Sequence, residues 1–246
     1  MSLRSTISTP SGKQRYVRRM FATIADRYDL ITVVLSYGRD RAWKDRLIRL
    51  AAITSDDRVL DLACGTGDIV FRAAEKARIA IGLDVTFRML QLAAAKRSLF
   101  RRSADGAKAN APLIAGDMLA LPFPSRHFTV VTTGYGLRNV PDLEQAIDEI
   151  ARVLAPGGRL LSLDFNRPAQ PLLRAAYLLY LTIVGSTLGF VLHRDPDTYR
   201  YIPESIRNYP GADGVARLLA RRGFVDVRVV PLLGGLMAIH VARLPF

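Results

Sequence analysis

The chain contains one cysteine, three histidines and one tryptophan among its 246 residues. A lone thiol, Cys64, excludes an internal disulfide and fits a reducing, cytoplasmic compartment. His127, His193 and His240 are far apart, and no Cys/His cluster has the spacing of metal ligands, so we expect no metal site. Acidic residues are also scarce, because 22 Asp and Glu oppose 35 Lys and Arg and leave a formal net charge of +13.

The basic excess is concentrated near the N-terminus, where eleven Lys and Arg but only four Asp lie between Arg4 and Arg49. Such charge favours an anionic partner, either nucleic acid or an anionic membrane surface, although a need for solubility also explains it. Residues 1–12 are rich in Ser and Thr and have no apolar core, which does not fit a secretory signal. We predict a disordered basic tail over residues 1–15.

Residues 59–68, which read VLDLACGTGD, have the pattern of a buried strand, a tight turn and the start of a helix. Gly65 and Gly67 let the backbone pass close to a ligand, because they carry no Cβ. The next apolar run, residues 79–83, ends at Asp84. An acid about 20 residues after a glycine-rich strand-to-helix turn suits the two hydroxyls of a ribose.

From residue 58 onward, strand and helix patterns alternate. Strands are predicted near 58–61, 79–83, 112–115, 128–133, 159–165, 224–230 and 237–242, and helices near 67–76, 86–97, 143–154 and 212–222. This alternation predicts an α/β fold with a seven-stranded, mostly parallel sheet and helices on both faces. The last two strands are predicted to form a hairpin through residues 231–235. A parallel sheet closed by an antiparallel hairpin is the architecture of class I S-adenosylmethionine (SAM) methyltransferases. Val70 occupies the third glycine position of the dinucleotide GxGxxG motif, which argues against NAD.

Two additions surround this sheet in a single predicted domain, residues 16–246. Helices at 16–35 and 40–52 precede the first strand as a helical cap. Residues 98–110 are polar and basic and are predicted as a loop.

Residues 175–192 carry no charge. A stretch of this length is at the lower limit for a membrane span, but the strands that follow it must return to the same sheet, which disfavours a span. We therefore expect one or two apolar helices that line a substrate pocket or lie in a membrane interface, with an ordinary core helix as the alternative. We predict that residues 170–210, which include this stretch, form an apolar insertion that acts as a lid over the substrate.

Four stretches together resemble the ubiquinone/menaquinone-biosynthesis C-methyltransferases of the UbiE type. They are FATIADRYD at 21–29, DLACGTGD at 61–68, GDMLALPFP at 116–124 with GYGLRNV at 134–140, and YRYIPESI at 199–206. The resemblance spans about residues 16–242 and implies methyl transfer from SAM to a ring carbon of a polyprenyl quinol. Between benzoquinol and naphthoquinol the sequence says little, and conversion of demethylmenaquinol to menaquinol is favoured.

The resemblance also implies roles for individual residues. The positions expected to hold SAM are Asp61, Gly65, Thr66, Gly67, Asp84, Asp117, Met118 and Gly134. The positions expected to act on the quinol are Arg138, Asn139 and Tyr28. Arg138 would stabilise a phenolate, and Asn139 would orient the quinol oxygen or a water. Either a water held by these groups or Tyr28 would relay the proton. Two of these residues also have a purely structural explanation. Tyr28 fits a core position, and Arg138 fits a surface ion pair with Asp142.

Expected partners are the quinol, an anionic membrane surface and either a second copy of the chain or a quinone-synthesis complex. The alternatives are a methyltransferase for another lipid, a scaffold without catalysis and a nucleic-acid methyltransferase. The last is disfavoured, because the Asn/Asp-Pro-Pro-Tyr tetrapeptide of amino-methylating enzymes is absent and no nucleic-acid module is appended.

Overall fold

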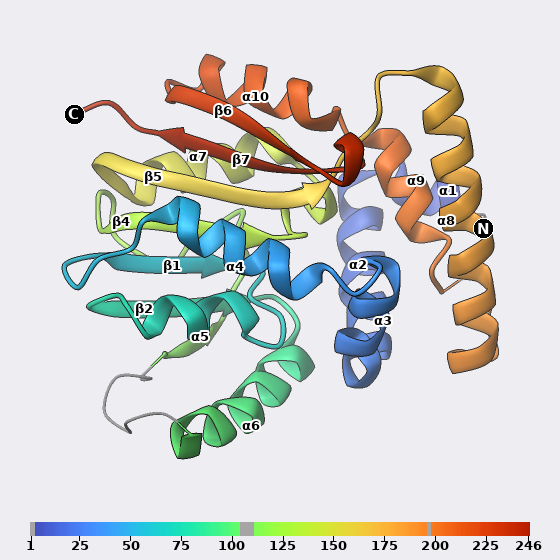
Figure 1. The fold of residues 1–246 in the computed structure, drawn as a ribbon, viewed down its shortest axis with the longest axis horizontal. Helices are drawn as coiled ribbons and strands as arrows, with labels where there is room; N and C mark the ends of the chain where they lie inside the picture. Colours follow the sequence, from blue (N-terminus) through green and yellow to red (C-terminus); the bar gives the residue numbers. More distant parts are fainter. Residues whose placement is uncertain (1–2, 104–110, 196–197) are drawn as a thin grey trace.

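A computed structural model describes residues 3–103, 111–195 and 198–246, and their strands form one seven-stranded sheet (Figure 1). The strands are β1 (Arg58–Leu62), β2 (Ile79–Asp84), β3 (Leu113–Ala115), β4 (Phe128–Gly134), β5 (Leu154–Phe165), β6 (Val225–Leu232) and β7 (Met237–Arg243). Their order is β3-β2-β1-β4-β5-β7-β6. The first five strands are parallel, and β7 runs antiparallel to both β5 and β6. The predicted sheet and its closing hairpin are confirmed.

Helices cover both faces of the sheet because its central strands are apolar on both sides. In β1, Val59 packs into one core cluster and Leu60 and Leu62 into the other. The first cluster includes side chains of α4 (Asp40–Ala51), α5 (Asp68–Ala74) and α6 (Phe87–Ser103). The second includes side chains of α7 (Leu143–Val153) and α10 (Gly211–Arg221). The helix α6 enters the predicted loop at 98–110, of which residues 104–110 lie outside the described part.

The N-terminal segment differs from the disordered tail predicted for residues 1–15. It contains α1 (Leu3–Ile7) and the start of α2 (Pro10–Ile24). Thr9 caps α2 by accepting a hydrogen bond from the Gly12 N–H, and Pro10 occupies the first turn, where its missing N–H costs nothing. Ile7 and Val17 pack in one cluster with Tyr201, so these helices gain stability from a contact far away in sequence.

The single helix predicted at 16–35 is divided. After α2 a 3₁₀ turn, Ala25–Arg27, leads into α3 (Tyr28–Leu35). The apolar stretch forms one continuous helix, α8 (Pro171–His193), followed by α9 (Tyr201–Asn208). By length and composition α8 is able to cross a membrane, but β6 and β7 return to the sheet after it. Figure 1 shows α8 and α9 beside α2 and α3, beyond the carboxyl ends of the parallel strands.

Candidate active site

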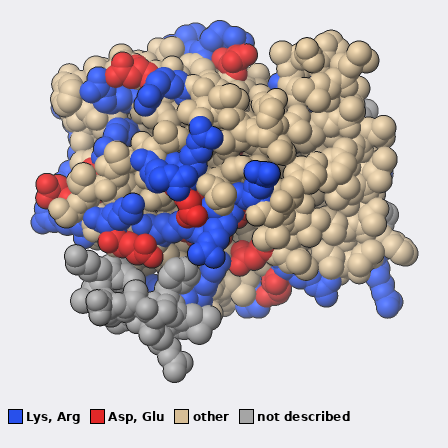
Figure 2. Space-filling model, in the orientation of Figure 1, with Lys and Arg blue, Asp and Glu red and all other residues tan. Residues whose placement is uncertain are grey.

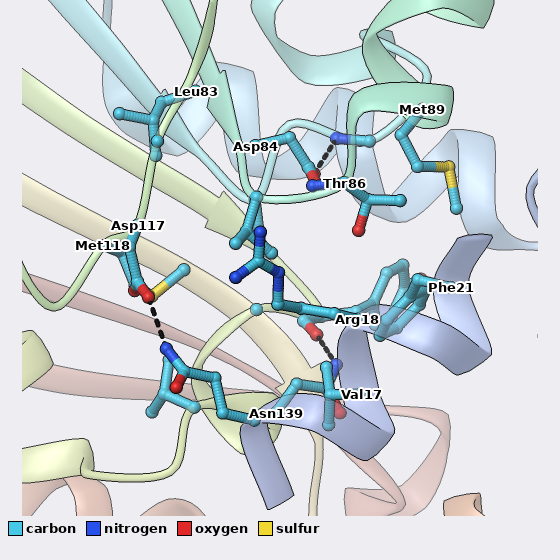
Figure 3. Close-up of a pocket in the computed structure, with 18 of the residues that line it drawn as sticks. Val17, Arg18, Phe21, Leu83, Asp84, Thr86, Met89, Asp117, Met118 and Asn139 are labelled. Atoms are coloured by element: carbon cyan, nitrogen blue, oxygen red, sulfur yellow. Dashed lines mark hydrogen bonds between the residues drawn. The ribbon is translucent and has the colours of Figure 1, made fainter. Parts of the chain in front are cut away.

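A cleft of about 730 Å³, its open mouth included, lies at the carboxyl ends of β1, β2 and β4 (Figure 3). This is the edge at which open α/β sheets bind their ligands. The strand ends and their loops form its floor, and α2 forms its roof through Gln14, Val17, Arg18 and Phe21. Most of the residues predicted to hold SAM line this cleft, namely Gly65, Asp84, Asp117, Met118 and Gly134.

Asp84 is held rigidly at the tip of β2 by two backbone donors. The Gly65 N–H donates to its Oδ2 over 2.8 Å, and the Thr86 N–H donates to its Oδ1 over 2.7 Å. Gly65 has a positive φ of 55°, a conformation that glycine adopts without strain. Burial raises the pKa of Asp84. The carboxylate lines the cleft, where a ribose diol would meet it.

The opposite end of the cleft suits an adenine ring. Leu83 and Met118 supply apolar surface, and Asp117 supplies a polar edge. One oxygen of Asp117 accepts from the Leu119 N–H over 3.0 Å, and the other accepts from Gln14 over 2.7 Å (Figure 3). A Cβ on Gly134 would lie 2.7 Å from the end of the buried Ile69 side chain, so the packing under the cleft favours glycine at this position. The described residues therefore fit the adenosine part of SAM.

Three predicted cofactor residues do not line the cleft. Asp61 is 1 % exposed, and its Oδ1 accepts from Thr132 over 2.8 Å. Burial raises its pKa to about 7. Thr66 donates through its hydroxyl to Asp29 over 2.7 Å. Gly67 precedes α5 with a φ of +89°. These three residues therefore stabilise the strand-to-helix turn and do not form the surface of the cleft.

A second, mostly apolar cleft of about 590 Å³ adjoins the first. Residues of α2, α3 and α9 form its walls, and Arg138 supplies its fixed charge. Phe21, Tyr28, Tyr135 and Asn139 line both clefts, so the two spaces meet at these side chains. The predicted substrate-side residues Tyr28, Arg138 and Asn139 are therefore brought together where a ligand in one cleft would meet a ligand in the other.

Arg138 is buried, with only 5 % exposure, which contradicts a surface ion pair. Its Nε lies 3.2 Å from Asp164 Oδ1, its Nη1 contacts the Ser205 hydroxyl, and its guanidinium lies 4.9 Å from the centre of the Phe165 ring. Asp142 instead caps α7 by accepting from the Gln145 N–H over 3.0 Å. The arginine is therefore a fixed positive charge, oriented by residues of β5 and α9.

Asn139 and Tyr28 complete the junction. The Asn139 amide donates to the Tyr135 carbonyl over 2.6 Å, which leaves its buried Oδ1 without a partner in the described part of the chain. Because Asn139 lines both clefts, this acceptor is placed to meet a donor on a bound ligand. Tyr28 lines both clefts, and burial raises the pKa of its phenol to about 12, so it stays protonated at neutral pH.

Sequence reasoning missed the roof formed by α2. Val17 and Phe21 show only as an ordinary apolar helix face, and Gln14 and Arg18 carry no motif. Tyr135 was also missed, although it lies within the GYGLRNV stretch.

Comparisons with known proteins agree with this geometry. The profile of the ubiE/COQ5 methyltransferase family matches residues 9–243. A demethylmenaquinone methyltransferase of Thermus thermophilus is 39 % identical, covering 92 % of this chain and 100 % of that protein. A ubiquinone/menaquinone biosynthesis C-methyltransferase UbiE of Azotobacter vinelandii is 37 % identical, covering 94 % and 90 % respectively.

Solved structures share the fold at low identity. A SAM-dependent methyltransferase of Thermotoga maritima superposes with a TM-score of 0.61 at 15 % identity, covering 92 % of this chain and 99 % of the other. One of Methanosarcina mazei gives a TM-score of 0.57 at 20 % identity, covering 79 % and 95 %. The fold is that of a class I SAM methyltransferase, and the chain is a methyltransferase whose cofactor is SAM. On its family profile and its curated relatives, the chain belongs to the ubiE/COQ5 methyltransferase family.

Proposed function

We propose that the enzyme methylates a ring carbon of a polyprenyl quinol, with a demethylated naphthoquinol as the preferred substrate. The quinol class follows the names of relatives such as the UbiE protein of Azotobacter vinelandii, and the naphthoquinol follows the demethylmenaquinone methyltransferase of Thermus thermophilus. The observation that carries the proposal is the apolar cleft that meets the SAM cleft at Asn139 and has Arg138 in its own lining. An apolar ring with one or two hydroxyl groups fits that lining.

The residues at the junction supply what the reaction needs. SAM supplies an electrophilic methyl group when it is bound. A phenol carbon becomes a good nucleophile when its neighbouring hydroxyl loses a proton, so the enzyme must stabilise a phenolate. The Arg138 guanidinium offers several donors, and the unpartnered Oδ1 of Asn139 accepts from a quinol hydroxyl. The plane of Phe165 under the guanidinium helps to fix the position of that charge.

Substrate choice is tested with isotope-labelled SAM and two demethylated quinols of equal prenyl length, one a naphthoquinol and one a benzoquinol. We expect label in the naphthoquinol product, with or without label in the benzoquinol product. The value of kcat/KM should be at least about tenfold higher for the naphthoquinol, which corresponds to a difference of about 1.4 kcal/mol in transition-state binding. Product masses and initial rates provide the measurement. Preference for the benzoquinol contradicts the ring assignment, and the absence of label from both products contradicts the quinol class.

We further propose that the enzyme binds the cytoplasmic membrane peripherally through an α3/α8 apolar face. This face comprises exposed apolar side chains of both helices and of the turn after α3, from 39 % to 87 % exposed: Leu30, Val33, Val34, Tyr37, Leu172, Leu173, Leu179, Ile183, Phe190 and Val191. Tyr37 and Tyr180 stack at 5.5 Å between ring centres and connect the two helices. In Figure 2 the side of the molecule that holds α8 is almost free of charge, whereas the blue side chains gather over the sheet.

The position of this face supports delivery of a lipid substrate. Ile31 and Leu35 of α3 point inward and line the apolar cleft, while other residues of the same helix are exposed. Arg174 in the first turn of α8 and Arg194 at its end flank the face with positive charge. Anionic lipid headgroups attract such charge, while the apolar side chains enter the interface. We therefore place the docking region at α3 and α8; a contact of the basic N-terminal segment with an anionic surface stays a prediction.

Docking is tested by sedimentation with vesicles of neutral and anionic phospholipid. The double variant Ile183→Glu/Phe190→Glu is expected to bind at least about tenfold more weakly, because two apolar side chains each contribute about 1.5–3 kcal/mol when removed from water. Val225→Glu is the matched control, since Val225 is 39 % exposed on β6 and outside the face. Equal binding by both variants, or no binding by the natural sequence at low salt, contradicts the proposal.

A further inference from the structure

A line of polar side chains leads away from the junction of the two clefts toward α4. Tyr135, which lines both clefts, donates its phenol proton to Asp40 Oδ1 over 2.7 Å. Lys44, one turn along α4, lies 2.6 Å from Asp40 Oδ2. The side chains of Asp40 and Lys44 are only 8 % and 7 % exposed. The phenol is thus a link between the site of reaction and a buried carboxylate.

Behind Asp40 the ion pairs continue. Lys44 also lies 2.9 Å from Asp68 of α5, and Lys96 of α6 contacts Asp68 and lies 3.1 Å from Asp29 of α3. These five ion-paired groups are three carboxylates and two ammonium groups, so the network carries one excess negative charge when all are ionised. One proton added to it brings the network to neutrality. The Asp40–Lys44 end, where the proton would enter, is buried, whereas Asp29 at the other end is 52 % exposed.

Other charged and titratable groups surround this network. Arg72 of α5 donates to the Asp68 carbonyl and pairs with Asp45 of α4 over 2.8 Å. Tyr28 of α3 interacts with both Asp40 and Lys44. Asp61 of β1 interacts with Lys44, and Asp164 of β5 interacts with Tyr135. Because Arg138 compensates Asp164, that carboxylate is neutralised where it lies.

The backbone of Tyr135 is unusual. Its φ is +62°, a left-handed conformation that residues other than glycine adopt rarely and at a cost of about 1 kcal/mol or more. The Tyr135 N–H donates to the Leu163 carbonyl over 2.7 Å, which holds this conformation at the end of β4. A strained residue that faces two clefts indicates a functional requirement for its position.

We propose that Asp40 accepts the hydroxyl proton of the quinol through Tyr135. The quinol proton moves to Tyr135 Oη as the proton of Tyr135 moves to the Asp40 carboxylate, and the electron pair of the broken O–H bond stays on the quinol oxygen. After the ring carbon has gained the methyl group, it loses its own proton to water. The oxygen takes its proton back along the same path, so Asp40 ends the cycle ionised and one proton is released overall.

This assignment rests on the proposed quinol cleft and supplies the base that the cleft itself lacks. A guanidinium such as that of Arg138 offers donors and no acceptor, and an amide such as Asn139 does not accept a proton. Burial and the nearby Asp40 raise the pKa of Tyr135 well above its usual value, so its phenol stays neutral between turnovers and only passes the proton on. Tyr135 is thus the catalytic residue, and Lys44 is a positioning residue that orients Asp40.

The test compares Tyr135→Phe and Asp40→Asn with the natural enzyme from pH 6 to 9. Near pH 7 we expect kcat to fall about 10²-fold for each, the usual size of a lost general base, with the SAM Kd within about twofold. The deficit should shrink as pH rises, because more of the quinol is then ionised without help. It should also shrink with a halogenated quinol, whose hydroxyl is more acidic. Tyr209→Phe is the control, since Tyr209 is a buried tyrosine that lines neither cleft.

Two results overturn the relay. One is a kcat within about threefold of the natural value in both variants. The other is a loss that neither pH nor quinol acidity reduces, which identifies the Tyr135–Asp40 bond as a structural anchor alone. Arg138→Lys separates this failure from failure of the cleft assignment. If that variant is slow while Tyr135→Phe is normal, the cleft stands and the relay is wrong; if both are normal, the cleft assignment is wrong.

Discussion

Replacing Arg138 with lysine is expected to lower kcat by about 10²–10³-fold while the SAM Kd stays within about twofold, because the loss of one preorganised donor to a developing oxyanion has this size. Lysine keeps the positive charge but lacks the planar fork that contacts Asp164 and Ser205 together. Its ammonium would pair with Asp164 and would no longer donate to the quinol oxygen. Initial rates at saturating SAM, with calorimetry for the Kd, provide the measurement.

The choice of lysine over alanine follows from the burial of the ion pair. Arg138→Ala would leave Asp164 buried without its partner, which costs about 3–5 kcal/mol of stability and confuses loss of turnover with loss of fold. We therefore expect Arg138→Ala to lower Tm clearly and Arg138→Lys to lower it little. Ser205→Ala is the matched control, because it removes one contact of the guanidinium and keeps the charge in place. Natural turnover in Arg138→Lys would contradict the role assigned to Arg138.

Local patterns were sufficient to predict the sheet. Each central strand is a short apolar run bounded by turn residues, as at Val59 and Leu60, and the helices between them show the helical period. The parallel order follows, because strands joined through helices cannot pair as hairpins. The direct step from β6 to β7 predicted the antiparallel end in the same way.

Contacts between distant segments were beyond this reasoning. The helices at the N-terminus are stabilised by Tyr201, and the roof they place over the SAM cleft has no local signature. The alternative reading that paired Arg138 with Asp142, four residues away, rested on proximity in sequence alone. In the folded chain Arg138 pairs with Asp164 on the neighbouring strand β5. Tyr135 and Asp40 are 95 positions apart, so no spacing rule relates them.

The same limit applies to α8. Its composition predicted an apolar helix but left open whether the apolar surface faces a pocket, a bilayer or the core. The structure divides that surface, because Tyr177, Leu178 and Leu181 pack inward while Leu179 and Ile183 are exposed. Because the sequence is apolar around the whole helix, no difference in hydrophobicity between its sides predicts which side packs inward.

Asp84→Asn is expected to raise the SAM Kd by about 10–100-fold, because it removes charge from acceptors that meet the ribose diol, and hydrogen bonds to charged groups contribute about 1.5–3 kcal/mol each. Asparagine keeps the shape and one oxygen acceptor for the Gly65 or Thr86 N–H, whereas alanine would leave both donors unpaired. Calorimetry with SAM measures the Kd.

The kinetic outcome distinguishes Asp84 from Arg138. Once SAM is raised to saturation, we expect Asp84→Asn to recover kcat to within about threefold of the natural enzyme, because a lost interaction with the bound cofactor raises KM without changing the chemical step. Arg138→Lys should not recover at any SAM concentration. An unchanged Kd in Asp84→Asn contradicts ribose binding at the end of β2. A kcat that stays low at saturation would instead show that the carboxylate aligns the methyl donor with the ring carbon.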